Sequence, residues 1–410
     1  MNPHPPAPAP SPRTIRTPLR RAPLALLAAL AIAIAAAPAM SEAKRRAKRP
    51  AAAPVAAAVA AGYADRPEVR SFVAEMVAEH GFIESELLAM FAQVRRSDDA
   101  MRLMAPAPPT FKRSWQAYRS RFLDPLRIRE GLRFWSEQEL WLDLAAQRFG
   151  VPPEIVVAII GVETLYGRMT GEFRVVDVLT TLAFDYPQRA DYFRSELEQY
   201  LLYSRESALD VFSVRGSFAG AIGLPQFMPG SIRRFAVDLD GDGSVELRSN
   251  PADAIGSVAS FLATHGWRSG EPVRFEMRFD SEARLAPLVE AGIRPQFTIS
   301  ELAEYGVSSA EPVAPDMPLA LVDLPNGDGA ASYYLGAPNF FAITRYNRSS
   351  FYAMAVYELA RRLAVLRREL RGAAPGTPVH TISAMPASDT ASGNCPKNSN
   401  PNTTGTTECV

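Results

Sequence analysis

Apolar positions recur at helical spacing along most of the chain. From Arg66 to Met104 they fall three and four residues apart, and His80-Gly81 is a predicted break between two amphipathic helices. The same spacing predicts further helices over Ser136–Phe149, Val175–Tyr203 and Gly256–His265. The pattern therefore indicates a predominantly helical body.

One stretch is apolar on every side. Residues 151–170, VPPEIVVAIIGVETLYGRMT, open with two prolines, which suit the first turn of a helix, and continue with Ile155–Val162, which has no polar side chain. A helix that is apolar all round is buried. Glu163 stands at its end, where poor solvation raises the pKa of a carboxyl group and suits it to general acid catalysis. On this stretch alone, a partly buried glutamate paired with an arginine is the favoured interpretation, and the general acid is the alternative.

The chain changes character at residues 215–231, RGSFAGAIGLPQFMPGS. Glycines and prolines surround Gln226, Phe227 and Met228. A solvent-exposed loop does not need Phe and Met, and a core helix does not tolerate this much Gly and Pro. The combination suits backbone packed against an extended ligand, with the Gln226 amide as donor and acceptor. A tight interdomain turn is an equal alternative.

Residues 238–249, DLDGDGSVELRS, resemble the first half of an EF-hand loop. Aspartates occupy positions one, three and five, and glycine occupies position six. Position twelve, where a Glu is expected, is Ser249, and a carboxylate slightly further on could replace it. The predicted ligands of a structural Ca²⁺ are Asp238, Asp240, Asp242, Ser244 and Asp253. An Asp-Gly turn without an ion is the alternative.

The hydrophobic pattern becomes alternating from Glu271 onwards, which predicts a small β-rich region over residues 271–338. Asn326-Gly327 and Asp328-Gly329 are predicted hairpin turns. Residues 339–371 return to a helical pattern rich in tyrosine. The predicted class is α+β with helix predominating.

Composition narrows the chemistry. The 410 residues carry 44 basic and 44 acidic side chains, so the net charge gives no reason to expect nucleic acid as a partner. Both cysteines, Cys395 and Cys409, lie in the C-terminal tail, which excludes a cysteine nucleophile in the folded body. There are four histidines and no G-x-S-x-G motif. Any catalysis is therefore expected to use carboxylates and no organic cofactor.

The N-terminal pattern predicts an export signal at residues 1–39. Arginines precede the apolar run Ala22–Ala37, and Ala37-Pro38-Ala39 fits a cleavage site. An uncleaved membrane anchor is the alternative, and no cysteine follows the run to accept a lipid. A linker is predicted at residues 40–65 and a disordered tail at 372–410.

Four blocks of the chain, in order, resemble the membrane-bound lytic murein transglycosylase B family. They are GVETLYGRMTGEFRVVDVLTTLAFDYPQRADYF, GSFAGAIGLPQFMPGS, DLDGDGSVELRSNPADAIGSVASFLATHGW and NFFAITRYNRSSFYAMAV. The resemblance covers about Pro67 to Leu366. It implies a lysozyme-like helical core with an additional helical part and the EF-hand-like loop (238–253) within residues 66–270, and a return to the core at 339–371.

Carried over residue by residue, the resemblance makes Glu163 the catalytic acid. It implies a sugar site lined by Gln226, Ser217, Tyr118, Arg189, Tyr346 and Asn339. Phe261 stands where the family often has a tyrosine facing the substrate, so a hydrogen bond is expected to be missing there. The family's cation loop matches the five ligands named above, and it too draws its last carboxylate from further along.

The activity implied is non-hydrolytic cleavage of the MurNAc-β-1,4-GlcNAc bond of peptidoglycan, with formation of 1,6-anhydroMurNAc. Glu163 would act as acid and then as base, without a second carboxylate. The implied partner is the glycan strand, and the protein is expected to be a periplasmic monomer. Two alternatives stay open, a lysozyme-type hydrolase that uses water and a peptidoglycan-binding protein without activity.

Overall fold

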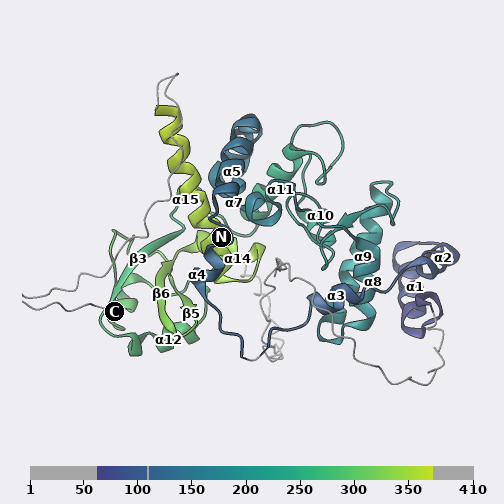
Figure 1. The fold of residues 1–410 in the computed structure, drawn as a ribbon, viewed down its shortest axis with the longest axis horizontal. Coiled ribbons are helices and arrows are strands. Elements are labelled where there is room, and N and C mark those ends of the chain that lie inside the picture. Colours follow the sequence, from purple (N-terminus) through teal and green to yellow (C-terminus); the bar gives the residue numbers. More distant parts are fainter. Residues whose placement is uncertain (1–61, 109, 373–410) are drawn as a thin grey trace, which may run out of the picture. The chain divides into compact units, whose positions relative to one another are not determined.

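The computed structural model describes residues 62–108 and 110–372 (Figure 1). Its α-helices are α1 (Pro67–His80), α2 (Glu84–Gln93), α3 (Asp98–Leu103), α4 (Trp115–Arg119), α5 (Pro125–Glu137), α6 (Glu139–Phe149), α7 (Pro153–Thr164), α8 (Val175–Asp185), α9 (Ala190–Glu206), α10 (Pro229–Phe235), α11 (Pro251–Thr264), α12 (Ala286–Glu290), α13 (Ile299–Ala303), α14 (Pro338–Tyr346) and α15 (Ser350–Gly372). The 3₁₀ helices and strands are η1 (Tyr63–Asp65), η2 (Pro187–Arg189), η3 (Glu282–Leu285), β1 (Phe173–Arg174), β2 (Arg215–Gly216), β3 (Arg274–Phe279), β4 (Val307–Ser309), β5 (Ala320–Asn326) and β6 (Gly329–Gly336). The predicted α+β class with helix predominating is confirmed.

Helix α7 lies inside the main hydrophobic core and packs against α5, α6 and α11. Every residue from Ile155 to Val162 is buried, as the all-round apolar pattern predicts. Ile159 and Ile160 are inaccessible to water, and full burial of such a side chain contributes about 1.5–3 kcal/mol. The helix ends at Thr164, directly after Glu163. The most buried helix of the core therefore carries Glu163 at its last turn.

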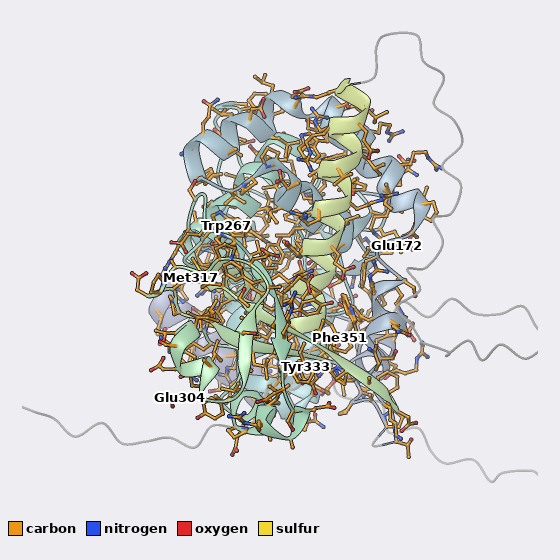
Figure 2. The ribbon with its side chains drawn as sticks, turned by 90° about the vertical axis from the view of Figure 1, so that its left-hand side faces the viewer. Glu172, Trp267, Glu304, Met317, Tyr333 and Phe351 are labelled. Atoms are coloured by element: carbon orange, nitrogen blue, oxygen red, sulfur yellow. The ribbon has the colours of Figure 1, made fainter. Side chains whose placement is uncertain are left out.

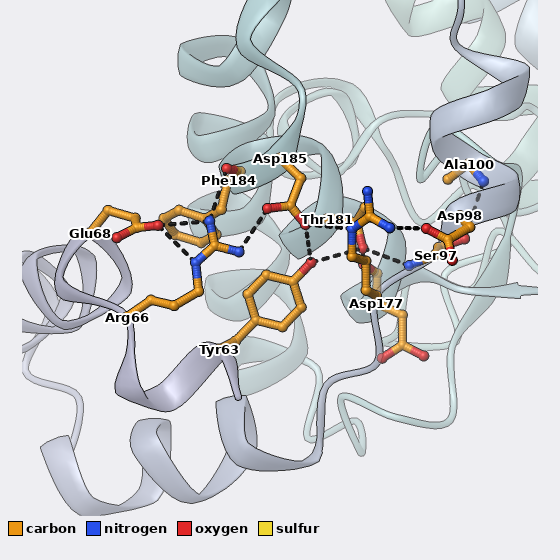
Figure 3. Close-up of polar contacts among 11 residues, drawn as sticks. Tyr63, Arg66, Glu68, Ser97, Asp98, Ala100, Asp177, Thr181, Phe184 and Asp185 are labelled. Atoms are coloured by element: carbon orange, nitrogen blue, oxygen red, sulfur yellow. Dashed lines mark hydrogen bonds and ion pairs between the residues drawn. The ribbon is translucent and has the colours of Figure 1, made fainter. Parts of the chain in front are cut away.

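A polar network fastens the N-terminal helices to α8 (Figure 3). The hydroxyl of Tyr63 donates to Asp185 Oδ2 at 2.7 Å, and Arg66 donates to Asp185 Oδ1 at 2.7 Å. The amide of Ser97 donates to the hydroxyl of Thr181 at 2.9 Å. Tyr63 is buried, and the last residues of the predicted linker form η1. They fold because Tyr63 finds an apolar site for its ring and a carboxylate for its hydroxyl.

Several predicted helices are divided by turns. The segment predicted as the second N-terminal helix forms two helices, α2 and α3. The helix predicted from Ser136 begins at Glu139. The helix predicted over residues 175–203 is broken before Pro187, because proline lacks an amide donor and restricts the residue before it. The helix predicted over 339–371 is interrupted between α14 and α15.

A four-stranded antiparallel sheet, in the order β4-β3-β6-β5, follows α11 in the chain. The predicted hairpin between β5 and β6 is confirmed, and Gly327 takes a φ of +65° in its turn, which glycine adopts without strain. Along β5, Leu321 packs in the small core of the sheet region, whereas Val322 and Leu324 pack in the main core. This alternation attaches the sheet to the helices. The short pair β1–β2 was not predicted.

The first turn of α15 meets α4 beside the sheet, and Figure 2 shows Phe351 at this end of the helix. The Phe351 ring lies 5.7 Å from the ring of Trp115 and 5.5 Å from that of Tyr118, both on α4. The guanidinium of Arg113 lies 4.6 Å from the centre of the Phe351 ring. These contacts hold the start of α15 next to α4.

The predicted export signal (1–39), most of the linker (40–61) and the tail (373–410) with Cys395 and Cys409 lie outside the described residues. Within the described chain, no single helix is long and apolar enough to cross a membrane. The predicted domain boundaries stay predictions.

Candidate active site

The chain turns sharply after Glu163. Leu165 and Tyr166 both have left-handed backbone conformations, with φ of +50° and +60°. This conformation costs a residue with a side chain about 1–2 kcal/mol. It persists only where surrounding contacts hold it, and such residues cluster at functional sites. The strained turn therefore directly follows the last turn of α7, which carries Glu163.

The carboxyl group of Glu163 is bonded to a tyrosine. The hydroxyl of Tyr352, in the first turn of α15, donates to Glu163 Oε1 at 2.6 Å. Burial raises the pKa of Glu163 from 4.5 to about 7, and the Tyr352 bond lowers it in part. The side chain keeps a part of its surface exposed. No arginine among the described residues pairs with it, so the favoured interpretation from the isolated stretch is wrong.

Two further tyrosines face the same carboxyl group. The pKa of Tyr118, on α4, and that of Tyr346, on α14, are raised by burial and then by the negative charge of Glu163. The Tyr346 ring stacks on that of Tyr352 with 6.3 Å between their centres. The Tyr118 ring packs against Phe122 at 5.0 Å. Tyrosines from three helices therefore lie within electrostatic range of the carboxyl group, and Tyr352 is hydrogen-bonded to it.

The glycine-rich loop, residues 215–231, is hydrogen-bonded to two of the helices around Glu163. The hydroxyl of Thr164 donates to the carbonyl of Leu224 at 2.9 Å. The hydroxyl of Tyr346 donates to the carbonyl of the next residue, Pro225, at 2.6 Å. The loop is thus bonded to the end of α7 and to the end of α14.

Gln226 and Ser217 both belong to this loop and keep a free hydrogen-bonding group. Gln226 has a φ of +50°, and its amide nitrogen donates to the carbonyls of Thr170 and Gly223, both at 3.0 Å. Its amide oxygen has no bonded partner in the described chain. The Ser217 hydroxyl accepts the amide of Ala221 at 3.0 Å, which leaves its hydrogen to donate. Gln226 therefore offers an acceptor and Ser217 a donor.

Asn339 and Arg189 make no contact with Glu163 among the described residues. Asn339 is completely buried, and its amide bonds to the backbone of Arg268 and Glu271. It lies seven residues before Tyr346, about 10 Å along the helix axis. The guanidinium of Arg189 lies over the ring of Tyr192 at 4.4 Å. The structure therefore gives Asn339 a structural role, and no contact in the described residues links either side chain to the carboxyl group.

Phe261 packs against one of the tyrosines near Glu163. It is buried on α11, and its ring lies 4.9 Å from the ring of Tyr346 and 3.9 Å from that of His265. The expected absence of a hydroxyl at this position leaves a purely apolar contact with Tyr346.

Three of the five predicted cation ligands converge. Asp238, Asp240 and Asp253 offer one oxygen each, and these oxygens lie within 4.8 Å of one another. Asp253 is completely buried at the start of α11, where its two oxygens accept the amides of Leu239 (3.0 Å) and Glu246 (2.8 Å). Carboxylate oxygens at this spacing fit a hard cation such as Ca²⁺.

Asp242, a further predicted ligand, lies outside this cluster of carboxylate oxygens. The carboxylate of Asp242 instead accepts the amide of Ser244 at 2.8 Å. Both residues are part of the same loop, so its backbone conformation is defined by internal hydrogen bonds. Three of the four predicted carboxylate ligands therefore converge, and the Ser244 ligand stays a prediction.

Tyr352 was missed by sequence reasoning. It follows Tyr346 by six residues, in the block NFFAITRYNRSSFYAMAV. One signal could have identified it: a tyrosine at the start of an apolar helix is buried, and a buried hydroxyl needs a partner.

Comparisons with known proteins agree on one family. The family model described as the transglycosylase SLT domain matches residues 64–361. The membrane-bound lytic murein transglycosylase B of Escherichia coli (strain K12) is 41% identical over 312 residues, which cover 74% of this chain and 84% of that protein.

Solved structures are similar as well. The soluble lytic transglycosylase SltB1 of Pseudomonas aeruginosa is 44% identical, with a TM-score of 0.68, and covers 74% of this chain and 100% of its own. The Escherichia coli lytic transglycosylase Slt35, solved in complex with calcium, is 40% identical with a TM-score of 0.66, covering 75% of this chain and 95% of its own.

Proposed function

The chain belongs to the family of transglycosylases with an SLT domain, lytic transglycosylases of peptidoglycan with a lysozyme-like fold, and we propose that Glu163 is its single acid and base. The observation that carries this proposal is the Glu163 carboxyl group, whose pKa burial raises to about 7. A group with this pKa is substantially protonated at neutral pH, as a general acid must be.

In the first step, Glu163 transfers its proton to the oxygen between MurNAc and GlcNAc. The bond from this oxygen to C1 of MurNAc breaks, and GlcNAc leaves with the proton on its hydroxyl. The acetamido carbonyl oxygen of MurNAc stabilises the positive charge at C1. The hydroxyl of Tyr352 stabilises the new carboxylate, because its bond to Oε1 strengthens when the acceptor is charged.

In the second step, the Glu163 carboxylate accepts the proton of the MurNAc 6-hydroxyl. The oxygen of that hydroxyl bonds to C1 and closes the 1,6-anhydro ring, so no water is consumed. Two-carboxylate glycosidases hold their acidic groups about 5–10 Å apart. Burial raises the pKa of Glu163 and the Tyr352 bond lowers it in part, and no other described carboxyl group is hydrogen-bonded to Glu163.

The groups around Glu163 suit a bound sugar chain. Tyr118, Tyr346 and Tyr352 combine apolar ring faces with hydroxyls, and Gln226 and Ser217 each keep a hydrogen-bonding group available. We assign them the task of holding MurNAc so that its 6-hydroxyl, and not water, is next to C1. The sugar contacts expected for Asn339 and Arg189 have no support in their described contacts.

We also propose that Asp238, Asp240 and Asp253 bind a structural Ca²⁺. Three carboxylate oxygens within 4.8 Å of one another repel each other unless a cation lies between them. The similarity to Slt35, which was solved with calcium, supports the choice of ion. The ion has no part in the chemistry at Glu163.

Export to the periplasm is proposed from the N-terminal pattern of arginines and the apolar run Ala22–Ala37. A relative of this chain is named as a membrane-bound enzyme of murein. N-terminal sequencing of protein secreted from a bacterial host tests this. A mature chain that begins after Ala39 is expected, whereas a chain that still begins at Met1 would indicate an uncleaved anchor.

The function is tested by mass spectrometry of the soluble products released from peptidoglycan sacculi. Products that end in 1,6-anhydroMurNAc are expected. Reducing-end products, heavier by one water, would indicate a hydrolase. Folded protein that binds sacculi and releases nothing would indicate a binding role.

The role of Glu163 is tested in the same assay with Glu163→Gln, which keeps the shape of the side chain and cannot donate the proton. The variant is expected to fold and to release no products. Continued cleavage by it would exclude Glu163 as the single acid and base.

A further inference from the structure

The side chain of Tyr166 is inserted between two helices where α7 ends. A Cβ atom added to Gly131 of α5 would lie 2.3 Å from the Tyr166 hydroxyl oxygen, and one added to Gly161 of α7 would lie 2.4 Å from it. Only glycine at both positions leaves room for the ring. The ring also stacks on that of Phe134, with 5.3 Å between their centres. Tyr166 therefore fills a slot that α5 and α7 form together.

This ring belongs to the strained turn. Tyr166 and Leu165 both have positive φ, a conformation that residues with a Cβ atom rarely adopt. Tyr166 follows Glu163 by three residues. A short backbone segment therefore connects the buried ring to the residue that carries the acid. Burial of the ring offsets the strain of the turn and keeps it in one conformation.

Helix α5 holds the turn at two further points. Arg168, two residues after Tyr166, forms an ion pair of 2.6 Å with Glu130, whose side chain is 8% exposed. Arg127 donates through Nε to the carbonyl of Gly161 at 2.9 Å. On α5 the slot for Tyr166 is formed by Gly131, directly after Glu130, and Tyr166 itself lies between Gly161 and Arg168 in the chain. The turn is therefore clamped along one side of α5.

The hydroxyl of Tyr166 adds nothing to this clamp. Its oxygen is buried and has no hydrogen-bond partner among the described residues. An unpaired buried hydroxyl destabilises the folded state. The Tyr166 side chain is therefore held by its shape and not by a hydrogen bond of its hydroxyl.

We propose that Tyr166 is a positioning residue for the reaction: its ring wedges into α5 and α7 and thereby fixes the direction of the Glu163 carboxyl group. The proposal rests on the proposed role of Glu163. Tyr166 touches no reacting atom. It acts by holding the turn closed, which aims the carboxyl group and limits the access of water to it.

A loosened turn is expected to change the pH dependence of the activity. The titratable groups that face Glu163 are Tyr352, Tyr118 and Tyr346, and none of them ionises near neutral pH. Burial is the main cause of the raised pKa of Glu163. If water reaches the carboxyl group, its pKa falls, and the loss of activity at high pH begins at a lower pH.

Three variants separate the ring from the backbone. Tyr166→Gly favours the left-handed backbone but removes the ring, Tyr166→Phe keeps the ring without the hydroxyl, and Leu165→Gly relieves strain beside it. For Tyr166→Gly, kcat is expected to fall on the order of 100-fold with KM little changed, and the high-pH limb to move to lower pH. Tyr166→Phe and Leu165→Gly are expected to keep the kcat and the pH profile of the wild type.

Phe72→Leu is the control for lost stability alone, because Phe72 is a buried aromatic residue of α1 in contact with Phe91 and Phe184. It is expected to lower Tm and to leave the pH profile unchanged. Wild-type kcat and pH profile in folded Tyr166→Gly would overturn the proposal.

If Tyr166→Gly does not fold, Gly131→Ala tests the proposal instead, because the added methyl group displaces the Tyr166 ring. The expected result is the same lowered kcat and shifted limb, and a wild-type profile would overturn the wedge. These outcomes are distinct from failure of the proposed function, which would show as cleavage by Glu163→Gln.

Discussion

Thr164 and Leu224 lie 60 residues apart in the chain and are joined by a hydrogen bond of 2.9 Å from the Thr164 hydroxyl to the Leu224 carbonyl. The same hydroxyl accepts the amide of Gly167 at 3.0 Å. Thr164 follows Glu163, and Leu224 lies two residues before Gln226. One buried hydroxyl therefore joins the helix that carries the acid to the loop that is proposed to hold the sugar.

Removal of this hydroxyl is expected to weaken both the fold and the site. Thr164→Val keeps the shape but leaves the Leu224 carbonyl and the Gly167 amide without this partner, so the free energy of unfolding should fall by about 1–3 kcal/mol. Urea unfolding and product release from sacculi measure the two effects. Thr164→Ser, which keeps the hydroxyl, is the control. Equal stability of the Val and Ser variants would contradict the importance of this bond.

Glu163→Gln is expected to stabilise the protein at high pH. The folded pKa of Glu163 is raised to about 7, so its contribution is fully present below pH 4.5 and is lost as pH rises through 7. Glutamine removes this loss, and the variant should exceed the wild type by roughly 3 kcal/mol at pH 8.5. Thermal unfolding at pH 4, 6 and 8.5 measures the difference. A difference that does not change with pH would show that Glu163 titrates normally.

Tyr352→Phe is expected to raise the pKa of Glu163, because the Tyr352 bond lowers it in the wild type. The high-pH limb of activity should therefore move to higher pH. Loss of a bond to a charged group costs roughly 1.5–3 kcal/mol, which corresponds to a fall in kcat of about 10–100-fold. The pH profile of product release tests both effects. Tyr346→Phe is the control, since its hydroxyl donates to the Pro225 carbonyl; a shift of equal size in both variants would argue against a direct effect of Tyr352.

Asp185→Asn is expected to loosen the N-terminal helices. Burial alone would raise the pKa of Asp185, but hydrogen bonds from Arg66 and Tyr63 outweigh it, and the net pKa is lowered. The carboxylate therefore adds stability above its unfolded pKa of about 4, which is lost as pH falls through the folded value.

At pH 7 the Asn variant should lose roughly 1–3 kcal/mol, and the deficit should shrink below pH 4. Urea unfolding at pH 7 and pH 3 measures it. Asp98→Asn, an exposed partner of Arg96, should change stability by less than about 1 kcal/mol. A deficit for Asp185→Asn that stays the same at both pH values would refute the electrostatic account.

Ca²⁺ is expected to raise Tm without changing turnover. The cation would bind the folded carboxylates, so Tm of chelator-treated protein should rise with Ca²⁺ concentration. Asp253→Asn should remove this dependence, whereas Asp242→Asn, whose carboxylate bonds to the Ser244 amide instead, should keep most of it. Titration calorimetry that detects no binding by the chelator-treated wild type would exclude the site.

The candidate site was predictable where residues close in sequence define it. The apolar run before Glu163, the glycines around Gln226 and the aspartate spacing after Asp238 are visible as local patterns. The arginine partner expected from the isolated stretch was wrong, and Tyr352 was missed, because burial had to be matched to a hydroxyl 189 residues away. Asn339 was assigned to the sugar site by resemblance, yet its contacts are those of a structural residue.

The sequence by itself determined the helical class, the buried helix whose last turn carries Glu163, the β5–β6 hairpin and the aspartate spacing after Asp238. Each depends on periodicity or turn chemistry within a few residues, which the chain encodes locally. The tertiary structure decided that Tyr352 bonds to Glu163 and that Tyr166 occupies a slot between two glycines. Those relationships depend on the packing of distant segments at close density, and no local pattern specifies which distant side chains will meet.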